Sequence, residues 1–239
     1  SIGIGQFIHA VRRNLDMVYV LENNGVYGLT KGQYSATAVK GSKKKKGPAN
    51  EHQPIDLCKL AINLGCTFVA RSFSGSKKQL TALMKAAMSH KGFALIDIIS
   101  PCVTFNNNDE SLRSYTYVKD NDVELHAYDY IPTQTPIESD AAPEGEFHDI
   151  TLFDGSILRL ETIGSDHDPS DAMAALNALH KAEAEDKHVT GLLYFDPTKA
   201  TATEDQCLVE TPLSEVEDST MRPSAASLDT LNARFRGKA

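Results

Sequence analysis

The sequence contains 239 residues and carries a formal net charge of −8. Its contents of 41% hydrophobic and 23% charged residues are ordinary for globular proteins, which argues against a disordered or fibrous chain. The negative charge argues against a general nucleic-acid-binding protein, because such proteins neutralise phosphates with basic residues. The longest apolar runs, such as residues 93–99, fall far short of the roughly 20 residues that a membrane-spanning helix needs, so no membrane association is expected.

The first residues predict neither a signal peptide nor the natural start of a protein. They lack the basic start and the long apolar stretch of a secretory signal, so we expect a cytoplasmic protein. Ser1 is not an initiator methionine, and glycines at positions 3 and 5 precede a helical pattern. We therefore expect further residues upstream of Ser1.

The first 100 residues alternate between helical and strand patterns. Apolar residues at helical spacing predict helices over residues 6–14, 55–64 and 76–89. Short apolar runs predict strands that are buried on both faces, over residues 17–21, 67–70 and 93–99. This alternation predicts an α/β fold with a doubly wound parallel sheet and helices on both of its faces.

In sheets of this kind, ligands bind at the carboxyl ends of the strands. Asn23 and Asn24 follow the first predicted strand, and Pro101 and Cys102 follow the third. Because the carboxyl ends of parallel strands meet at one edge, we expect these two segments to share a site.

The pattern changes after about residue 105. Residues 115–119 and 123–130 are typical of short extended segments, and residues 131–145, with three prolines, are typical of a surface loop. Asp154 and Gly155 predict a β-hairpin between residues 150–153 and 157–161, because Asp-Gly suits a type I′ turn. The remaining predictions are a helix over residues 170–185 with Ser170 as its N-cap, a strand over 189–195 and a helix over 225–235.

We divide the chain into two parts on this basis. Residues 1–110 form the α/β core, and residues 111–239 form a C-terminal extension with the hairpin, a helix, a strand and a tail.

The four cysteines do not predict a disulfide framework or a complete metal site, because no two have the C-x-x-C spacing. Cys58, Cys66 and Cys207 are each expected to be small buried apolar residues. Cys102 differs, because it follows a proline directly at the end of a predicted strand.

The loop over residues 22–33 carries the sharpest chemical signal. Its glycines, at positions 25, 28 and 32, allow positive φ angles and a close approach of the backbone to a ligand. The amide oxygen of Asn24 and a backbone carbonyl two residues later are hard oxygen ligands of the kind that Mg²⁺ prefers, usually together with phosphate oxygens. From the residues alone, a simple Asn-Asn-Gly turn stays an open alternative.

Residues 2–37 resemble the thiamine-diphosphate motif of 2-oxoacid:ferredoxin oxidoreductase β subunits. The resemblance rests on the second half of that motif, Asn-x-x-Tyr-x-x-Thr-x-Gly-Gln, which is present here as Asn24, Tyr27, Thr30, Gly32 and Gln33. The first half, Gly-Asp-Gly-Asp, is absent and would precede Ser1. The resemblance implies a thiamine-diphosphate-binding fold and a thiamine-diphosphate-dependent enzyme.

The same resemblance implies roles for individual residues. Asn24 would give its side-chain oxygen, and Val26 its backbone carbonyl, to Mg²⁺. The coenzyme would contact a run of neighbouring residues, namely Asn24, Val26, Tyr27, Gly28, Leu29 and Thr30. No catalytic residue is assigned, because in this family the carboxylate that activates the coenzyme comes from a partner α subunit.

Residues 98–105 resemble a second segment of the family, in which a cysteine is the fourth ligand of a 4Fe–4S cluster. Cys102 has that position, and cysteine thiolates are the usual ligands of such clusters. The other three ligands would lie upstream of this chain. A core cysteine behind a proline stays the alternative.

The implied activity is the reversible oxidative decarboxylation of a 2-oxoacid, with coenzyme A as co-substrate and ferredoxin as electron acceptor. Leu29 indicates the 2-oxoglutarate branch, which forms succinyl-CoA and CO₂, because the pyruvate branch tends to have an asparagine there. Two alternatives stay open within the enzyme class, a pyruvate:ferredoxin oxidoreductase and another thiamine-diphosphate enzyme subunit. A non-catalytic binding module that keeps the fold is an alternative of another class.

Residues 43–46 are four consecutive lysines. Their simplest interpretation is a solvated loop. They would also make a local positive patch that could attract an acidic ferredoxin or the phosphates of coenzyme A.

Overall fold

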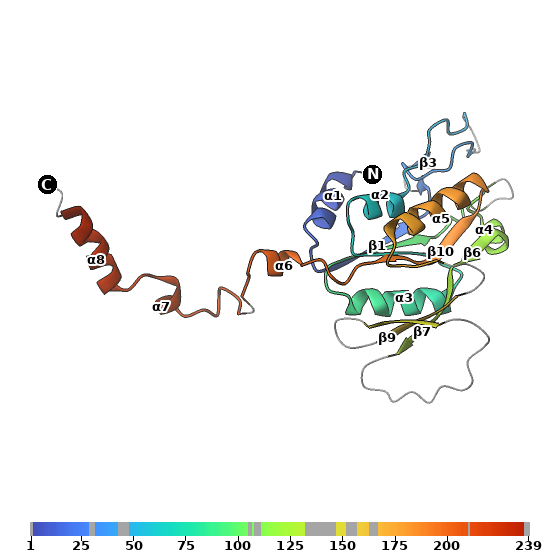
Figure 1. Cartoon of the computed structure of the whole chain (residues 1–239). Helices are drawn as coiled ribbons and strands as arrows, with labels where there is room; N and C mark the ends of the chain where they lie inside the picture. Colours follow the sequence, from blue (N-terminus) through green and yellow to red (C-terminus); the bar gives the residue numbers. More distant parts are fainter. Residues whose placement is uncertain are drawn as a thin grey trace. The chain divides into compact units, whose positions relative to one another are not determined.

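The structure is a computed structural model of the chain (Figure 1). It describes residues 2–28, 32–42, 48–104, 107, 111–131, 147–151, 157–162, 167–209 and 211–236. The chain divides into two compact units, residues 1–202 and residues 203–239.

The first unit is built on a five-stranded sheet. In spatial order its strands are β1 (Met17–Asn23), β5 (Phe93–Ile99), β4 (Phe68–Phe73), β10 (His188–Phe195) and β6 (Asp122–Glu124). β1, β5 and β4 are parallel to one another, whereas β10 pairs antiparallel with β4 and parallel with β6. The sheet is therefore mostly parallel, and the predicted α/β class is confirmed.

Helices cover both faces of this sheet, as predicted (Figure 1). The helices on one face are α1 (Ile4–Arg12), α2 (Leu57–Asn63) and α5 (Ala172–Ala184). The other face carries α3 (Lys77–Ser89). Each face has its own apolar core, around Phe93 and Phe68 respectively, and each such buried side chain stabilises the fold by roughly 1.5–3 kcal/mol.

β1 lies at the edge of the sheet, and the prediction that it is buried on both faces is wrong. Its one neighbour among the described strands is β5. Met17 is 39% exposed and Val20 is 41% exposed, whereas β4 and β5 are buried along their whole length. A short apolar run predicts a strand but does not specify its place in the sheet, and that place decides how much of it is buried.

The helix boundaries follow from capping residues. Asp56 caps α2, because its carboxylate accepts hydrogen bonds from two backbone N–H groups of the first turn. Asp171 caps α5 in the same way. The prediction of Ser170 as the N-cap of α5 is wrong. The Ser170 hydroxyl donates to the Asp168 carboxylate at 2.7 Å, and the Asp171 carboxylate accepts the hydrogen bonds of the first-turn N–H groups instead.

The extended segment predicted over residues 115–119 is also wrong. These residues belong to the helix α4 (Tyr115–Asn121). Ser114 caps it by accepting a hydrogen bond from the backbone N–H of Tyr117 at 3.2 Å, and Val118 is fully buried. Local capping and the burial of one apolar side chain outweigh the strand propensity of the aromatic and β-branched residues here.

A smaller sheet follows α4 in the chain. Its strands, in spatial order, are β7 (His126–Ile131), β9 (Ile157–Thr162) and β8 (Phe147–Thr151). β8 and β9 pair antiparallel, so the predicted hairpin is confirmed, although its Asp-Gly turn lies outside the described residues. Of the predicted surface loop over residues 131–145, residues 132–145 also lie outside them. The small sheet lies beside α3 (Figure 1).

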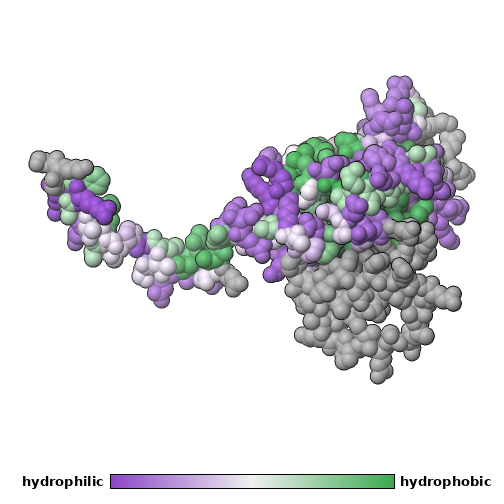
Figure 2. Space-filling view, in the orientation of Figure 1, coloured by the Kyte–Doolittle hydropathy of each residue, from purple (hydrophilic) through white to green (hydrophobic). Residues whose placement is uncertain are grey.

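The second unit contains α7 (Asp218–Met221) and α8 (Ala225–Arg236), which follow α6 (Ala202–Asp205) in the chain. α8 confirms the predicted last helix. Its large apolar side chains are exposed (Figure 2): Leu208, Val209, Leu213, Met221, Leu228, Leu231 and Phe235. Cys207 is exposed as well, so its predicted burial is wrong, whereas Cys58 and Cys66 are buried as predicted.

Among the described residues, none of the helices has both the length and the apolar character required to cross a membrane.

The second half of the sequence also contributes to the main sheet and its core, through β10 and α5. The boundary at residue 110 between a coenzyme-binding part and an extension stays a prediction.

Candidate functional site

The loop after β1 begins with a tight turn. Asn24 Oδ1 accepts a hydrogen bond from the backbone N–H of Val26 at 3.0 Å. Gly25 makes this turn possible, because its φ of +74° lies in the left-handed region that favours glycine. The Gly25 carbonyl accepts a hydrogen bond from the backbone N–H of Ser35 at 3.1 Å, which folds the loop back on itself.

The described residues on either side of positions 29–31 form a small two-stranded sheet. β2 (Val26–Tyr27) pairs antiparallel with β3 (Gln33–Tyr34). Tyr27 is 38% exposed and Gly28 is exposed, so this part of the loop is accessible to a ligand. Leu29 and Thr30, like the lysines of residues 43–46, lie outside the described residues.

The structure brings the two predicted segments together at one edge of the sheet. Asn23 and Ile99, the last residues of β1 and β5, pair with each other. The backbone N–H of Ser100 donates to the Asn23 carbonyl at 3.2 Å. Cys102 follows two residues later and is partly exposed. The predicted proximity of the Asn24 turn and the Cys102 segment is confirmed.

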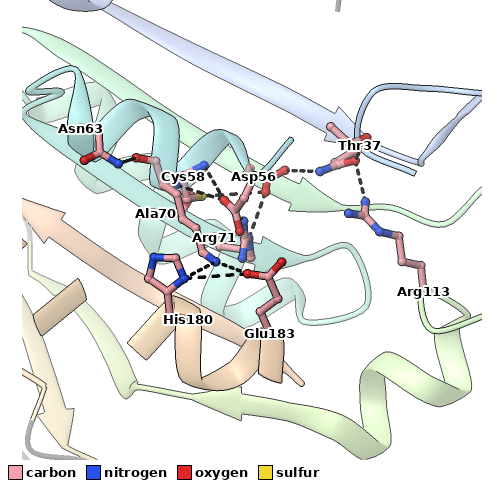
Figure 3. A network of polar contacts seen from close by, with 12 residues as sticks. Thr37, Asp56, Cys58, Asn63, Ala70, Arg71, Arg113, His180 and Glu183 are labelled. Atoms are coloured by element: carbon pink, nitrogen blue, oxygen red, sulfur yellow. Dashed lines mark hydrogen bonds and ion pairs between the residues drawn. The ribbon is translucent and has the colours of Figure 1, made fainter. Parts of the chain in front are cut away.

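Asn23, which is 6% exposed, is the centre of a polar network, and its partners Thr37 and Arg113 are labelled in Figure 3. Its Nδ2 donates to Asp97 Oδ1 at 2.9 Å. Its Oδ1 accepts hydrogen bonds from Thr37 Oγ1 and from Arg113 Nη1, both at 2.7 Å. Three separate segments of the chain therefore fix the residue that directly precedes Asn24.

The network continues across the sheet to Arg71. Arg71 Nε donates to Asp97 Oδ2 at 3.0 Å, and Arg71 Nη2 donates to Asp56 Oδ1 at 2.8 Å (Figure 3). Burial alone would lower the pKa of the Arg71 guanidinium, but the neighbouring Asp56 carboxylate helps to raise that pKa well above its usual value. Burial acts to raise the pKa of Asp56, but the Arg71 charge and the hydrogen bonds from the Lys59 backbone and from Arg71 together outweigh burial, so this pKa is lowered. Both groups are thus charged.

The charges of this network balance. Two guanidinium groups, those of Arg71 and Arg113, stand beside two carboxylates, those of Asp56 and Asp97. A balanced buried cluster avoids the large cost of an uncompensated charge in a low-dielectric interior. The thiol of Cys58 lies 3.9 Å from Asp97 Oδ2, and burial raises its pKa well above the usual value, so it stays a neutral thiol.

A cavity of about 110 Å³ lies beside the network. Its polar lining includes Asn23, Asp56, Arg71, Asp97, Arg113 and His188. Because β10 is antiparallel to β4, its first residue, His188, lies at the same edge as the carboxyl ends of β1, β5 and β4. The cavity is therefore placed where parallel sheets bind ligands.

Magnesium fits the donor types of the Asn24 turn. An amide oxygen has two lone pairs, so the hydrogen bond from Val26 does not by itself exclude a metal ion at Asn24 Oδ1. Mg²⁺ requires an octahedron of oxygens. Among the described residues there is no group of three or more His, Cys, Asp and Glu side chains that could hold a metal ion. The described part of the loop thus offers a partial set of oxygen ligands, and Cys102 offers one sulfur atom.

Known proteins match the chain over these elements. Residues 1–98, which include β1, the Asn24 turn and most of β5, match the family described as "Thiamine pyrophosphate enzyme, C-terminal TPP binding domain". A "2-oxoacid:ferredoxin oxidoreductase subunit beta" from Sulfolobus sp. is 50% identical over 108 residues, which are 45% of this chain and 35% of that protein. The resemblance to 2-oxoacid:ferredoxin oxidoreductase β subunits is confirmed.

Other relatives of this oxidoreductase group support the same conclusion. A "2-oxoacid:ferredoxin oxidoreductase 1, subunit beta" from Aeropyrum pernix is 40% identical over 147 residues, 61% of this chain and 44% of that protein. A "2-oxoglutarate synthase subunit KorB" from Methanocaldococcus jannaschii is 37% identical over 131 residues, 53% of this chain and 48% of that protein. The chain spans less than half the length of the curated relatives it matches.

A solved structure of the same kind of oxidoreductase extends the similarity to nearly the whole chain. It is the 2-oxoglutarate:ferredoxin oxidoreductase from Magnetococcus marinus with 2-oxoglutarate, coenzyme A and succinyl-CoA bound. The TM-score is 0.64 at 27% sequence identity, over 98% of this chain and 62% of that chain. The similar fold therefore includes residues after 105, where the sequence resemblance is loose.

Apart from Asn23, the sequence patterns did not single out the residues of the polar network. One signal was present, because Asp97 is the only charged residue of the apolar strand β5, and a carboxylate in a buried strand requires a cationic partner. Arg71 in the next strand of the sheet is that partner. Nothing in the sequence near Arg113 indicates its contact with Asn23, from which it is separated by 90 positions.

Proposed function

We propose that this chain is the thiamine-diphosphate-binding part of the β subunit of a 2-oxoacid:ferredoxin oxidoreductase. Its substrate would be 2-oxoglutarate, with coenzyme A as acyl acceptor and ferredoxin as electron acceptor. It would act in the cytoplasm together with an α subunit. The match of residues 1–98 to a coenzyme-binding domain and the names of the relatives support this proposal.

One observation carries the proposal. The Asn24 turn lies at the carboxyl end of β1, in the mostly parallel sheet of a domain that matches a thiamine pyrophosphate family. A position at a strand end and an amide oxygen beside a backbone carbonyl suit a diphosphate–magnesium site. The positive φ of Gly25 lets the chain turn directly after Asn24. Asn24 and Val26 are the residues that would hold the metal ion.

This chain's own residues would position the coenzyme. Thiamine diphosphate, when bound, supplies the nucleophilic carbon and the electron sink for decarboxylation of a 2-oxoacid. The proposed contribution of Asn24 and Val26 is to hold the magnesium-bound diphosphate end, and that of Tyr27, Gly28, Leu29 and Thr30 is to line the coenzyme. The network behind Asn23 would keep this loop in one conformation.

Cys102 is the proposed ligand of a 4Fe–4S cluster. Its segment directly follows Ile99 of β5, and Ser100 is hydrogen-bonded to Asn23, so a cluster held there would lie on the coenzyme side of the sheet. When bound, such a cluster would supply a one-electron carrier between the 2-oxoacid and ferredoxin. The partial exposure of Cys102 leaves its thiol accessible for this role.

The test is an activity measurement on the complete enzyme. The full-length β subunit is co-expressed with its α subunit, and ferredoxin reduction is measured with coenzyme A and each of 2-oxoglutarate, pyruvate and 2-oxobutyrate. We expect the highest kcat/KM with 2-oxoglutarate. A preference for pyruvate would assign the chain to the pyruvate branch, and no activity with any 2-oxoacid by a folded complex that binds thiamine diphosphate would contradict the proposal.

A further inference from the structure

Asn23 is contacted from both ends of the segment that carries Cys102. At one end, the backbone N–H of Ser100 donates to the Asn23 carbonyl at 3.2 Å. At the other end, Arg113 Nη1 donates to Asn23 Oδ1 at 2.7 Å. The candidate cluster ligand therefore lies in a stretch of chain whose two ends are anchored on the residue next to Asn24.

The Asn23 side chain has little freedom to reorient. Thr37 and Arg113 together occupy both lone pairs of its Oδ1, and its Nδ2 donates to Asp97. The residue is 6% exposed, so its side chain is held by contacts with protein groups. Removal of one donor would leave a buried acceptor with a vacant lone pair and loosen the end of β1.

Arg113 is presented to Asn23 from a rigid turn. Its backbone N–H donates to Ser111 Oγ at 3.2 Å, and the backbone N–H of Ser114 donates to the Ser111 carbonyl at 3.0 Å. Ser114 then caps α4, which is anchored through the buried Val118. Any shift of α4 would therefore be passed to Asn23 through the guanidinium group.

The burial of the Arg113 guanidinium group lowers the stability of the folded state. Arg113 Nε is buried and has no hydrogen-bond partner among the described residues. A buried polar group without a partner costs roughly 1–3 kcal/mol. Burial also lowers the pKa of this guanidinium, although the Asp97 carboxylate acts against that shift. A neutral apolar residue here would avoid these two penalties, but it would leave the Asp56 and Asp97 carboxylates with one guanidinium fewer and would remove a donor from Asn23 Oδ1. The arginine therefore trades an unpaired Nε for charge balance and for its contact with Asn23.

We propose that Arg113 is a positioning residue for the coenzyme loop. Through its hydrogen bond to Asn23, it would fix the backbone direction at the end of β1 and so the positions of Asn24 and Val26. It would also keep these residues at a fixed position relative to the Cys102 segment. This role rests on the proposed function, because it assumes that the Asn24 turn binds the magnesium-bound coenzyme. Arg113 lies outside residues 1–98, the part of the chain that matches the coenzyme-binding family.

The first test is coenzyme affinity in the complete αβ enzyme. Groups that hold metal ligands in place typically contribute 10- to 100-fold to metal affinity, so we expect Arg113→Met to weaken magnesium-dependent thiamine diphosphate binding by roughly that factor. Arg113→Lys keeps the charge and one donor, and should recover most of the affinity. The control is Leu83→Ala, which removes a fully buried side chain on the opposite face of the sheet. It should lower stability and leave the affinity unchanged.

The second test does not depend on coenzyme. Hydrogen exchange of the backbone amides of residues 24–28 is measured without ligand, and Arg113→Met should accelerate it while Leu83→Ala should not. If Arg113→Met does not fold, Thr37→Val removes the other donor to Asn23 Oδ1 and must show the same acceleration.

The possible outcomes separate the two proposals. The positioning role would be overturned if folded Arg113→Met kept wild-type coenzyme affinity and wild-type hydrogen exchange. It would also be overturned if Leu83→Ala lost as much coenzyme affinity as Arg113→Met. Absence of coenzyme binding by the wild-type enzyme would overturn the proposed function and with it the role in coenzyme binding. The exchange data would then show separately whether Arg113 holds the loop.

Discussion

Arg71 on β4 and Asp97 on β5 are direct partners in the parallel pairing of the two strands, and Arg71 Nε donates to Asp97 Oδ2 at 3.0 Å. The Asp97 side chain is 1% exposed. This ion pair connects the Asp56 cap of α2 with Asn23 at the end of β1, so the stability of the sheet and the geometry of the candidate site depend on the same contact.

Arg71→Met is expected to destabilise the protein strongly. Removal of one partner from a buried ion pair leaves an uncompensated charge and typically costs about 3–5 kcal/mol, and here Asp97 and Asp56 would both lose their ion-pair partner. Urea unfolding followed by circular dichroism measures the change. The matched control is Arg222→Met, which removes an arginine whose side chain is 75% exposed and should change stability by less than about 1 kcal/mol. Similar small effects in both variants would contradict the importance of the buried pair.

Asn24→Ala is expected to keep the fold and lose coenzyme affinity. The side chain is the proposed magnesium ligand, and alanine retains neither the metal contact nor the acceptor for the Val26 N–H group. Isothermal titration calorimetry of the αβ enzyme with thiamine diphosphate and Mg²⁺ measures the loss, which should exceed about 10-fold, or about 1.4 kcal/mol. Asn63→Ala, which removes an exposed amide at the end of α2, is the control. Wild-type affinity in Asn24→Ala would exclude Asn24 as a metal ligand.

Cys102→Ser is expected to weaken or bleach the visible absorbance of the iron–sulfur cluster in the purified enzyme. A hydroxyl is a much poorer ligand than a thiolate for such clusters. Electron paramagnetic resonance of the reduced enzyme provides a second spectrum of the same centre. Cys207→Ser, at an exposed cysteine of the second unit, is the control and should leave both spectra unchanged. Unchanged spectra in Cys102→Ser would exclude Cys102 as a cluster ligand and would favour a structural role for it.

Asp122 predicts a specific pH dependence of stability. Burial, assisted by the nearby Glu124 carboxylate, raises the pKa of Asp122 from 3.8 to about 6. The folded state therefore binds this proton more tightly than the unfolded state, and the contribution of Asp122 to stability is lost as the pH rises from about 4 to about 6. Asp122→Asn removes the ionisation and keeps an acceptor for Thr190 Oγ1, so it should raise the melting temperature at pH 8 and have little effect at pH 4.

Two buried histidines, His90 and His188, change the stability of the protein in the opposite direction to Asp122 over an overlapping pH range. Burial lowers the pKa of His90 and of His188 to about 4, so the folded state loses stability as the pH falls from 6.5 through 4. Comparison of Asp122→Asn with wild type at each pH removes this common contribution. Asp120→Asn, at a neighbouring exposed carboxylate, is the control variant for the loss of one negative charge. An Asp122→Asn effect that is the same at pH 4 and pH 8 would contradict the assignment.

The sequence was sufficient for elements with a strong local signal. β5 and α3 have a clear apolar period and clear end signals, and both were predicted within about one residue. α4 was missed because a local cap at Ser114 and the burial of Val118 decide its structure. The exposure of β1 was missed because burial depends on the neighbouring strands, and a strand's own residues do not specify them.

The candidate site shows the same limit. The turn at Asn24 is local, so its residues could be singled out from the motif before the structure was known. The contacts that hold this turn join Asn23 to Thr37, Asp97 and Arg113, at separations of 14, 74 and 90 positions. Such contacts exist only once the sheet has formed, and no pattern within a single window predicts them.

The central claim is that the Asn24 turn holds the magnesium ion that binds the coenzyme's diphosphate. The most direct measurement is an experimental structure of the αβ enzyme with thiamine diphosphate and Mg²⁺ bound. We expect Asn24 Oδ1 and the Val26 carbonyl oxygen to lie about 2.0–2.1 Å from the ion. A coenzyme bound elsewhere, or an ion whose ligands exclude both of these oxygens, would contradict the account.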